Sequence, residues 1–102
     1  MNSFELEQKL NSTLADNTRY SVGQFYDRID DEDLLNEPKT MKTVETFLSK
    51  KEAISLVLRS VADESIDRIR KECSSVVVQL QDVVSYDQIR TFNRRIVIAE
   101  CW

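Results

Sequence analysis

The sequence predicts an all-α fold, a small helical bundle built on a long antiparallel helical hairpin. Apolar residues recur at the helical period along most of the chain, two capping boxes mark helix starts, and the 102 residues include one Gly and one Pro. Because β-turns and phosphate-binding loops use Gly, a chain with one Gly disfavours both. Its length predicts a single domain, with acidic N-terminal helices over 1–37 and the hairpin core over 38–102.

Two short helices are predicted before Pro38. Ser3 can cap the first, in which Leu6, Leu10 and Leu14 recur every four residues. The second spans 21–29, and its apolar face is formed by Val22, Phe25, Tyr26 and Ile29.

The strongest periodic signal follows Pro38, where an apolar stripe runs at about 3.6 residues per step. Its members are Met41, Val44, Leu48, Ile54, Leu58, Ala62, Ile66, Ile69, Cys73, Val76, Leu80 and Val84. One helix of that length would be too long for a compact monomer. The capping box of Ser49 and Glu52 favours a break near residue 49, although the sequence leaves open whether 41–84 is one helix or two. A second capping box at Ser85 predicts a hairpin of helices 50–84 and 86–100.

Strands are the competing interpretation of the last third of the chain. Residues 76–78 (VVV) and 96–98 (IVI) are β-branched triplets that could pair as a short C-terminal β-hairpin in an α+β fold. Val76, Val78 and Leu80 also alternate as they would in a strand. The all-α fold is preferred because the helical stripe continues through this region.

The composition argues against catalysis. Histidine is absent, which removes the usual general base and the commonest metal ligand. Cys73 lies on the apolar stripe and is predicted to be a core residue. Neither Cys73 nor Cys101 has a histidine that could activate its thiol. The acidic residues of 27–33 lack the spacing and the central Gly of a calcium loop. We therefore predict no enzyme activity, no catalytic residue, no metal, no cofactor and no small-molecule substrate.

The charge distribution and the apolar stripe indicate a protein partner or self-association. The net charge is −4, and residues 1–37 hold nine acidic against three basic residues. The apolar stripe is also wider than one helix can cover. Candidate partner-binding residues are Asp30, Asp31, Asp33, Leu34, Leu35 and Trp102.

A nucleic-acid partner is the alternative, based on residues 82–95 (DVVSYDQIRTFNRR), whose spacing partly fits a DNA-binding helix-turn-helix. In a transcriptional regulator of that kind the contact residues would be Arg90, Asn93, Arg94 and Arg95. Val83 stands where the tight turn normally carries Gly, so packing of a helical hairpin is the preferred interpretation.

The run YSVGQFYDRIDDEDLL, residues 20–35, resembles the front of the small helical head-to-tail adaptor proteins of tailed phages. The resemblance implies a short helix here and a role in assembly. With no secretory leader or membrane-spanning run, we expect the chain in the cytoplasm or in a virion. The functional hypothesis is a non-enzymatic protein–protein interaction or assembly subunit, such as a virion adaptor-type structural protein or an inhibitor of a host protein.

Overall fold

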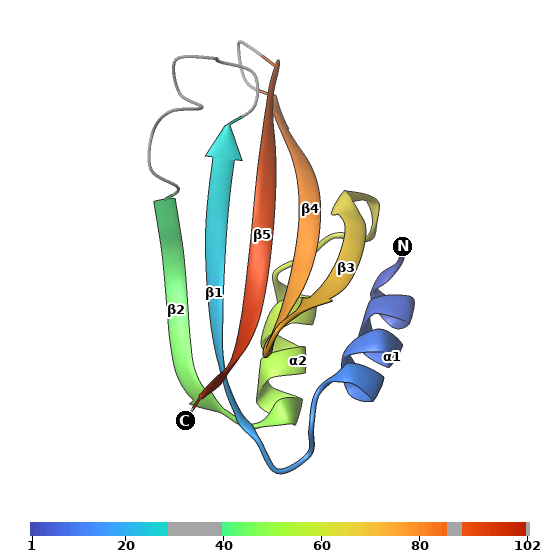
Figure 1. The fold of residues 1–102 in the computed structure, drawn as a ribbon. Coiled ribbons are helices and arrows are strands. Elements are labelled where there is room, and N and C mark those ends of the chain that lie inside the picture. The colour runs from blue at the N-terminus through green and yellow to red at the C-terminus, as the bar shows by residue number, and fades with distance from the viewer. Residues whose placement is uncertain (29–39, 86–88, 102) are drawn as a thin grey trace.

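The chain folds as two short helices beside one antiparallel sheet. The computed structural model describes residues 1–28, 40–85 and 89–101, and only the backbone at 26–28, 40–44, 82–85 and 89–93. The elements are α1 (Ser3–Thr13), β1 (Arg19–Arg28), β2 (Thr40–Leu48), α2 (Lys50–Arg59), a 3-10 turn (Asp63–Ser65), β3 (Ile66–Glu72), β4 (Ser75–Ser85) and β5 (Ile89–Cys101). The sheet has the strand order β2-β1-β5-β4-β3 (Figure 1).

The prediction of an all-α bundle is wrong, and the α+β alternative fits better. The two β-branched triplets do pair, with Val77 opposite Val97 at their centre. The hairpin is longer than expected, because β4 and β5 pair from Ser75 to Ser85. Three further strands join it, and β1 and β2 pair with each other across Pro38, so the two predicted parts of the chain contribute to one sheet.

The helical period was misleading over 66–84 because strand pairing is not a local property. Val76, Val78 and Leu80 fit the alternation of a strand, although Val76 and Leu80 also belong to a stripe whose average spacing is that of a helix. The β-branched side chains fit the pleated surface of a sheet. The ion pairs of β3 also join residues only one or two positions apart: Arg68 Nε lies 3.9 Å from Asp67 Oδ2, and Arg70 Nε lies 2.5 Å from Glu72 Oε1.

Two predicted helix starts are close to the observed ones. The Asn2 side chain caps α1 by accepting a hydrogen bond from Glu5 N, one residue before the expected cap. The predicted break near residue 49 is confirmed, because Ser49 begins α2 with a complete capping box. The helix expected at 21–29 and the helical stretch expected between Met41 and the break at residue 49 are instead strands β1 and β2, so the short helix implied by the adaptor resemblance is not found.

Both helices pack on one face of the sheet, where the main core lies. The core residues are Leu6, Leu10, Leu14, Tyr20, Val22, Ala53, Ile54, Val57, Ile66, Val76, Val78, Leu80, Ile96 and Ile98. The hydroxyl of Tyr20 accepts a hydrogen bond from Ala15 N at 2.7 Å, which holds the end of α1 to the start of β1. Figure 1 shows the helices beside one half of the sheet, with the strands continuing past them.

The turn between β3 and β4 corrects the expectation for Cys73. Glu72 pairs with Ser75, so Cys73 and Ser74 form a two-residue hairpin loop, and Cys73 is exposed instead of buried in the core. Its φ is 51°, a conformation for which Gly is the usual residue. A chain with one Gly therefore makes this hairpin at a steric cost.

Candidate interaction surface

The candidate site is the face of the sheet opposite the helices, which we call the open face. It consists of three rows of side chains that cross β3, β4, β5 and β1. In that order the rows are Glu72, Ser75, Ala99 and Ser21; Arg70, Val77, Val97 and Gly23; and Arg68, Gln79, Arg95 and Phe25. Residues directly opposite each other in a ladder point to the same side, so these twelve residues share one surface.

The helices leave the open face uncovered. Val77 is only 3% exposed, yet it is not part of the cluster of core residues that packs against α1 and α2. Its neighbours in the ladder, Val76 and Val78, are both members of that cluster. Alternation along β4 therefore directs Val77 to the opposite side of the sheet, where no element among the described residues packs.

The centre of the open face is apolar and has small side chains. Val97 and Ala99 are half-buried on β5, with Val77 beside them on β4. Gly23 occupies the matching position on β1 and has no side chain to project from the sheet. The result is a small aliphatic centre on this face, in which Val77 is buried among its neighbours and Val97 and Ala99 are partly accessible.

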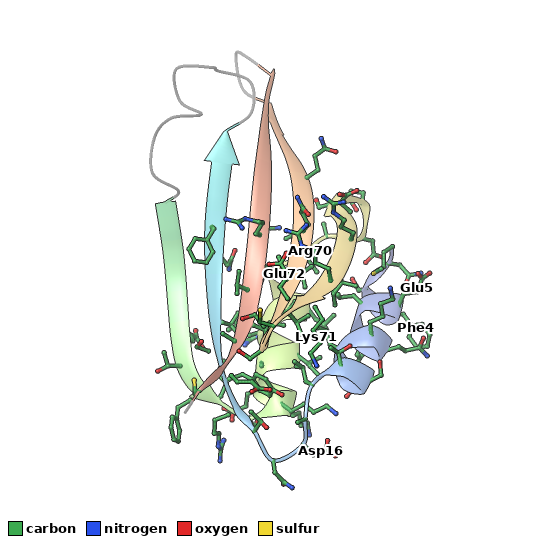
Figure 2. All side chains as sticks on the ribbon, viewed as in Figure 1. Phe4, Glu5, Asp16, Arg70, Lys71 and Glu72 are labelled. Carbon is green, nitrogen blue, oxygen red and sulfur yellow. The ribbon has the colours of Figure 1, made fainter. Side chains whose placement is uncertain are left out.

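Arginine side chains line one side of this centre. Arg68 Nε donates a hydrogen bond to Gln79 Oε1 at 2.8 Å, and Arg95 Cζ lies 5.6 Å from the centre of the Phe25 ring. Arg70 pairs with Glu72 along β3. Figure 2 shows Arg70 and Glu72 over the strands, with Lys71 closer to the helices. The register agrees, since Lys71 pairs with Val76 of the helix-covered side.

The twelve residues of the open face include three arginines and one glutamate, and Asp67 beside them lies 3.9 Å from Arg68. All three cations are arginines, which suit binding of carboxylates through a planar, bidentate geometry.

The helix side of the molecule has a hollow lined by both apolar and charged side chains. Its volume is about 590 Å³, and it lies between α1 and α2 with Ile54 and Leu58 on its wall. Lys50, its least exposed lysine, donates hydrogen bonds to Asn11 O at 2.7 Å and Asp16 Oδ1 at 3.0 Å. This lysine is therefore engaged in joining the helices.

Two carboxylates among the described residues have shifted pKa values, and both shifts are downward. Hydrogen bonds from the Ser49 backbone and side chain hold the pKa of Glu52 below its usual value of 4.5, with a smaller contribution from Arg19. Hydrogen bonds from the Ser3 hydroxyl and backbone lower the pKa of Asp63 in the same way. A general acid at neutral pH needs a raised pKa, which is the opposite of what these two carboxylates have. Both accept hydrogen bonds from backbone N–H groups at the start of a helix, Glu52 from Ser49 and Asp63 from Ser3.

The two described residues of the predicted nucleic-acid site point to opposite sides of the sheet. Arg94 Nη1 donates to Ser60 O at 2.7 Å and to Gln24 Oε1 at 3.4 Å on the helix side, whereas Arg95 lies on the open face. Arg90 and Asn93 are in β5, where only the backbone is described. Because this segment is strand, it does not present the arginines as a recognition helix would.

The predicted partner-binding residues lie outside the described residues; these are Asp30, Asp31, Asp33, Leu34, Leu35 and Trp102. Sequence reasoning missed the residues of the open face, in particular Arg68, Arg70, Gln79 and Phe25. The signal that could have found them is the alternation of Arg68 and Arg70 with Ile69, which a strand interpretation of 66–72 would have used.

Other features of the described residues point to no further site. No group of three or more Cys, Asp and Glu residues among them could hold a metal ion. No helix in the described part is long and apolar enough to cross a membrane.

Comparison with known proteins produced no match, whether to a protein-family model, a curated protein or a solved structure. The adaptor resemblance over residues 20–35 therefore gains no support from these comparisons. The function of the chain has to be inferred from its own surface chemistry.

Proposed function

We propose that this chain is a non-enzymatic protein-binding subunit that docks its partner on the open face of the sheet. The observation that carries the proposal is the apolar centre of that face, where Val77, Val97 and Ala99 lie together on the two central strands β4 and β5. Protein interfaces have this arrangement, with an apolar, closely packed centre, a polar rim and an excess of Arg over Lys.

The absence of histidine from the sequence and the downward pKa shifts of Glu52 and Asp63 support a non-enzymatic role. The free thiols of Cys73 and Cys101 suit a reducing compartment, which favours the cytoplasmic part of the expected location. A virion adaptor and an inhibitor of a host protein are both protein-binding roles that such a face could serve.

A DNA-binding regulator has less support. It requires Arg94 and Arg95 to act on one surface, and the sheet separates them. Direct readout by arginine also requires an element that enters the major groove, which a central strand such as β5 is not placed to do.

Site-specific photo-crosslinking in the native source tests the proposal. A photoreactive amino acid at Gln81, which is exposed beside the open face, should give a protein adduct, whereas the same group at Ser55 on α2 should not. Mass spectrometry then identifies the adduct, and the purified partner is titrated against the full chain.

Substitution at the centre of the face provides the matched measurement. Ala99→Trp should weaken binding of that purified partner by at least about tenfold, because a large side chain fills the shallow centre. Ser55→Trp makes a similar change on the helix side and should alter the affinity little. Adducts from Ser55 alone, or equal effects of the two substitutions, would contradict docking on the open face.

A further inference from the structure

We infer that Phe47 is an anchor residue of the docking surface, and that the partner is a folded protein with an apolar pocket that receives its ring. This inference rests on the proposed function and specifies the shape and chemistry of the partner. Its basis is the exposure of the ring, the backbone conformation at Phe47 and the contact of the ring with Arg19.

Phe47 lies at the margin of the open face, near the end of β2. The paired residues Tyr20 and Leu48 both contact the core on the helix side. Arg19 alternates with Tyr20 along β1, so it lies on the other side of the sheet, in line with Ser21 of the open face. Arg19 Cζ is 5.9 Å from the centre of the Phe47 ring. The ring therefore extends the docking surface beyond Ser21.

The ring is accessible to a partner. Among the residues whose burial the structure describes, Phe4 and Phe47 are the large apolar residues that remain exposed, and Phe47 is 69% accessible. The binding energy of protein interfaces is concentrated in a few residues, and aromatic and arginine side chains are enriched in interfaces. A Phe ring beside an Arg side chain has this composition.

The backbone at Phe47 is strained without an evident gain for the fold. Its φ of 63° lies in the left-handed region, where a Cβ atom is unfavourable and Gly is the favoured residue. An exposed ring recovers little of this cost by packing within the chain. Strained conformations are concentrated at functional sites, where the function accounts for them. A binding role accounts for a Phe residue at a position that suits Gly.

Arg19 restrains the ring before a partner arrives. Its guanidinium group lies beside the Phe47 ring, while its Nη1 is 3.9 Å from Glu52 Oε1 in the first turn of α2. A side chain that is already oriented loses less entropy on binding. Because Arg19 already has a carboxylate neighbour, the inference assigns the attraction to burial of the ring and requires no charge on the partner.

The projecting ring requires a concave partner. Phe47 is not among the residues that line the hollow between α1 and α2, so it is not part of a groove wall there. A folded protein can offer a preformed apolar pocket, whereas a disordered segment must first become ordered to make one. Exposed Glu45 and Glu52 and the net charge of −4 disfavour nucleic acid and anionic membranes as the occupant.

Matched substitutions of the two exposed Phe residues test the inference in the full chain. The probe is the purified partner identified by cross-linking from Gln81. Phe47→Ala should weaken its binding by at least about tenfold, because the anchor ring is lost. Phe4→Ala removes an equally exposed ring from α1 and should change the affinity by less than about twofold.

Phe47→Gly separates a binding role from a structural one. It should weaken binding as much as Phe47→Ala does, yet raise the urea midpoint of unfolding, because Gly relieves the strain. A residue that serves the fold alone would not give opposite changes in affinity and stability. A lowered midpoint together with weaker binding would therefore contradict the anchor role.

A soluble host with one apolar cavity provides a second, defined probe. β-Cyclodextrin at about millimolar concentration should compete with the partner for the wild-type chain, because both enclose the Phe47 ring. The same concentration should not change the residual binding of the Phe47→Ala variant. Failure to compete with the wild-type chain would overturn the pocket, as would a partner that circular dichroism shows to be disordered when free.

The outcomes separate this inference from the proposed function. If Ala99→Trp weakens binding but Phe47→Ala does not, the inference is overturned and docking on the open face stands. A photoreactive phenylalanine at position 47 that cross-links two copies of the chain would also overturn the inference. A partner cross-linked from position 47 but not from Gln81 would contradict the open face and leave the anchor intact. No adduct from either position would overturn both.

Discussion

At the residue scale, two side chains occupy backbone positions that normally favour Gly. Among the described residues other than Gly, Phe47 and Cys73 have positive φ angles, of 63° and 51°. Phe47 lies where the β1–β2 register shifts, since Leu48 pairs with Tyr20 and Glu45 with Val22. A Cβ atom in this region costs about 1–2 kcal/mol. Phe47 is also 69% exposed, so packing offsets little of its cost.

Cys73 provides the residue-scale prediction. Cys73→Gly should raise the free energy of unfolding by about 1 kcal/mol, because relief of the steric cost exceeds the extra entropy lost by Gly. Urea denaturation in the presence of a reductant measures the change. Cys73→Ala is the control, since it removes the thiol but keeps Cβ and should give no such gain. Equal stabilisation by the two substitutions would mean that the thiol, and not the φ angle, is responsible.

At the element scale, the start of α2 depends on a reciprocal pair of hydrogen bonds. Glu52 N donates to Ser49 Oγ at 3.2 Å, and Ser49 N donates to Glu52 Oε1 at 3.1 Å. Arg19 Nη1 lies 3.9 Å from the same carboxylate oxygen. These contacts favour the ionised form of Glu52 and satisfy backbone groups that the first helical turn leaves unpaired.

The lowered pKa of Glu52 predicts how stability changes with pH. Its folded-state pKa lies below the unfolded value, so its contribution is fully present above about pH 4.5 and is lost as the pH falls through the folded pKa. Urea denaturation between neutral and acid pH should show this loss, and Glu52→Gln should reduce it. Ser49→Ala should reduce the same pH-dependent part, because it removes a hydrogen bond that lowers the pKa. An unchanged pH profile in both variants would contradict this account of the cap.

At the scale of the whole molecule, Arg94 joins the helix layer to the sheet. It projects from β5 and donates hydrogen bonds to Ser60 O, just after α2, and to Gln24 Oε1 on β1. The next residue, Arg95, projects from the other face toward Phe25. Two adjacent arginines therefore have different roles, one within the fold and one on the proposed docking surface.

This separation predicts different effects on stability and binding. Arg94→Met should lower the free energy of unfolding by about 1–2 kcal/mol, because it leaves a carbonyl and an amide oxygen without their charged donor. Arg95→Met removes a guanidinium from the open face and should weaken binding of the docked partner more than Arg94→Met does. Urea denaturation of both variants, with titration of the partner, measures the two effects. Equal weakening of binding by the two substitutions would contradict the assignment of Arg95 to the docking surface.

Several features could be predicted from the sequence because they depend on nearby residues. The first helix, its buried Leu6 and Leu10, and the start of α2 at Ser49 all follow from periodicity and capping over a few positions. The β-branched triplets at 76–78 and 96–98 also indicated their pairing, although the helical stripe was preferred over them.

The open face could not be predicted in the same way, because it brings together residues that are far apart in the sequence. Phe25, Arg95, Gln79 and Arg68 share a row only after four strands have paired in register. A shift of register by one residue would send each of these side chains to the opposite face.

The sequence by itself determined where the helices begin, which residues are apolar enough to be buried, and that histidine chemistry is absent. The tertiary structure alone decided that 66–72 and 75–85 are strands, that Arg94 and Arg95 separate, and that Val77 and Val97 meet on the face opposite the helices. The physical reason is that helical hydrogen bonds and caps join residues about four apart, whereas each strand of a sheet completes its hydrogen bonds with a partner whose position only the folded chain sets.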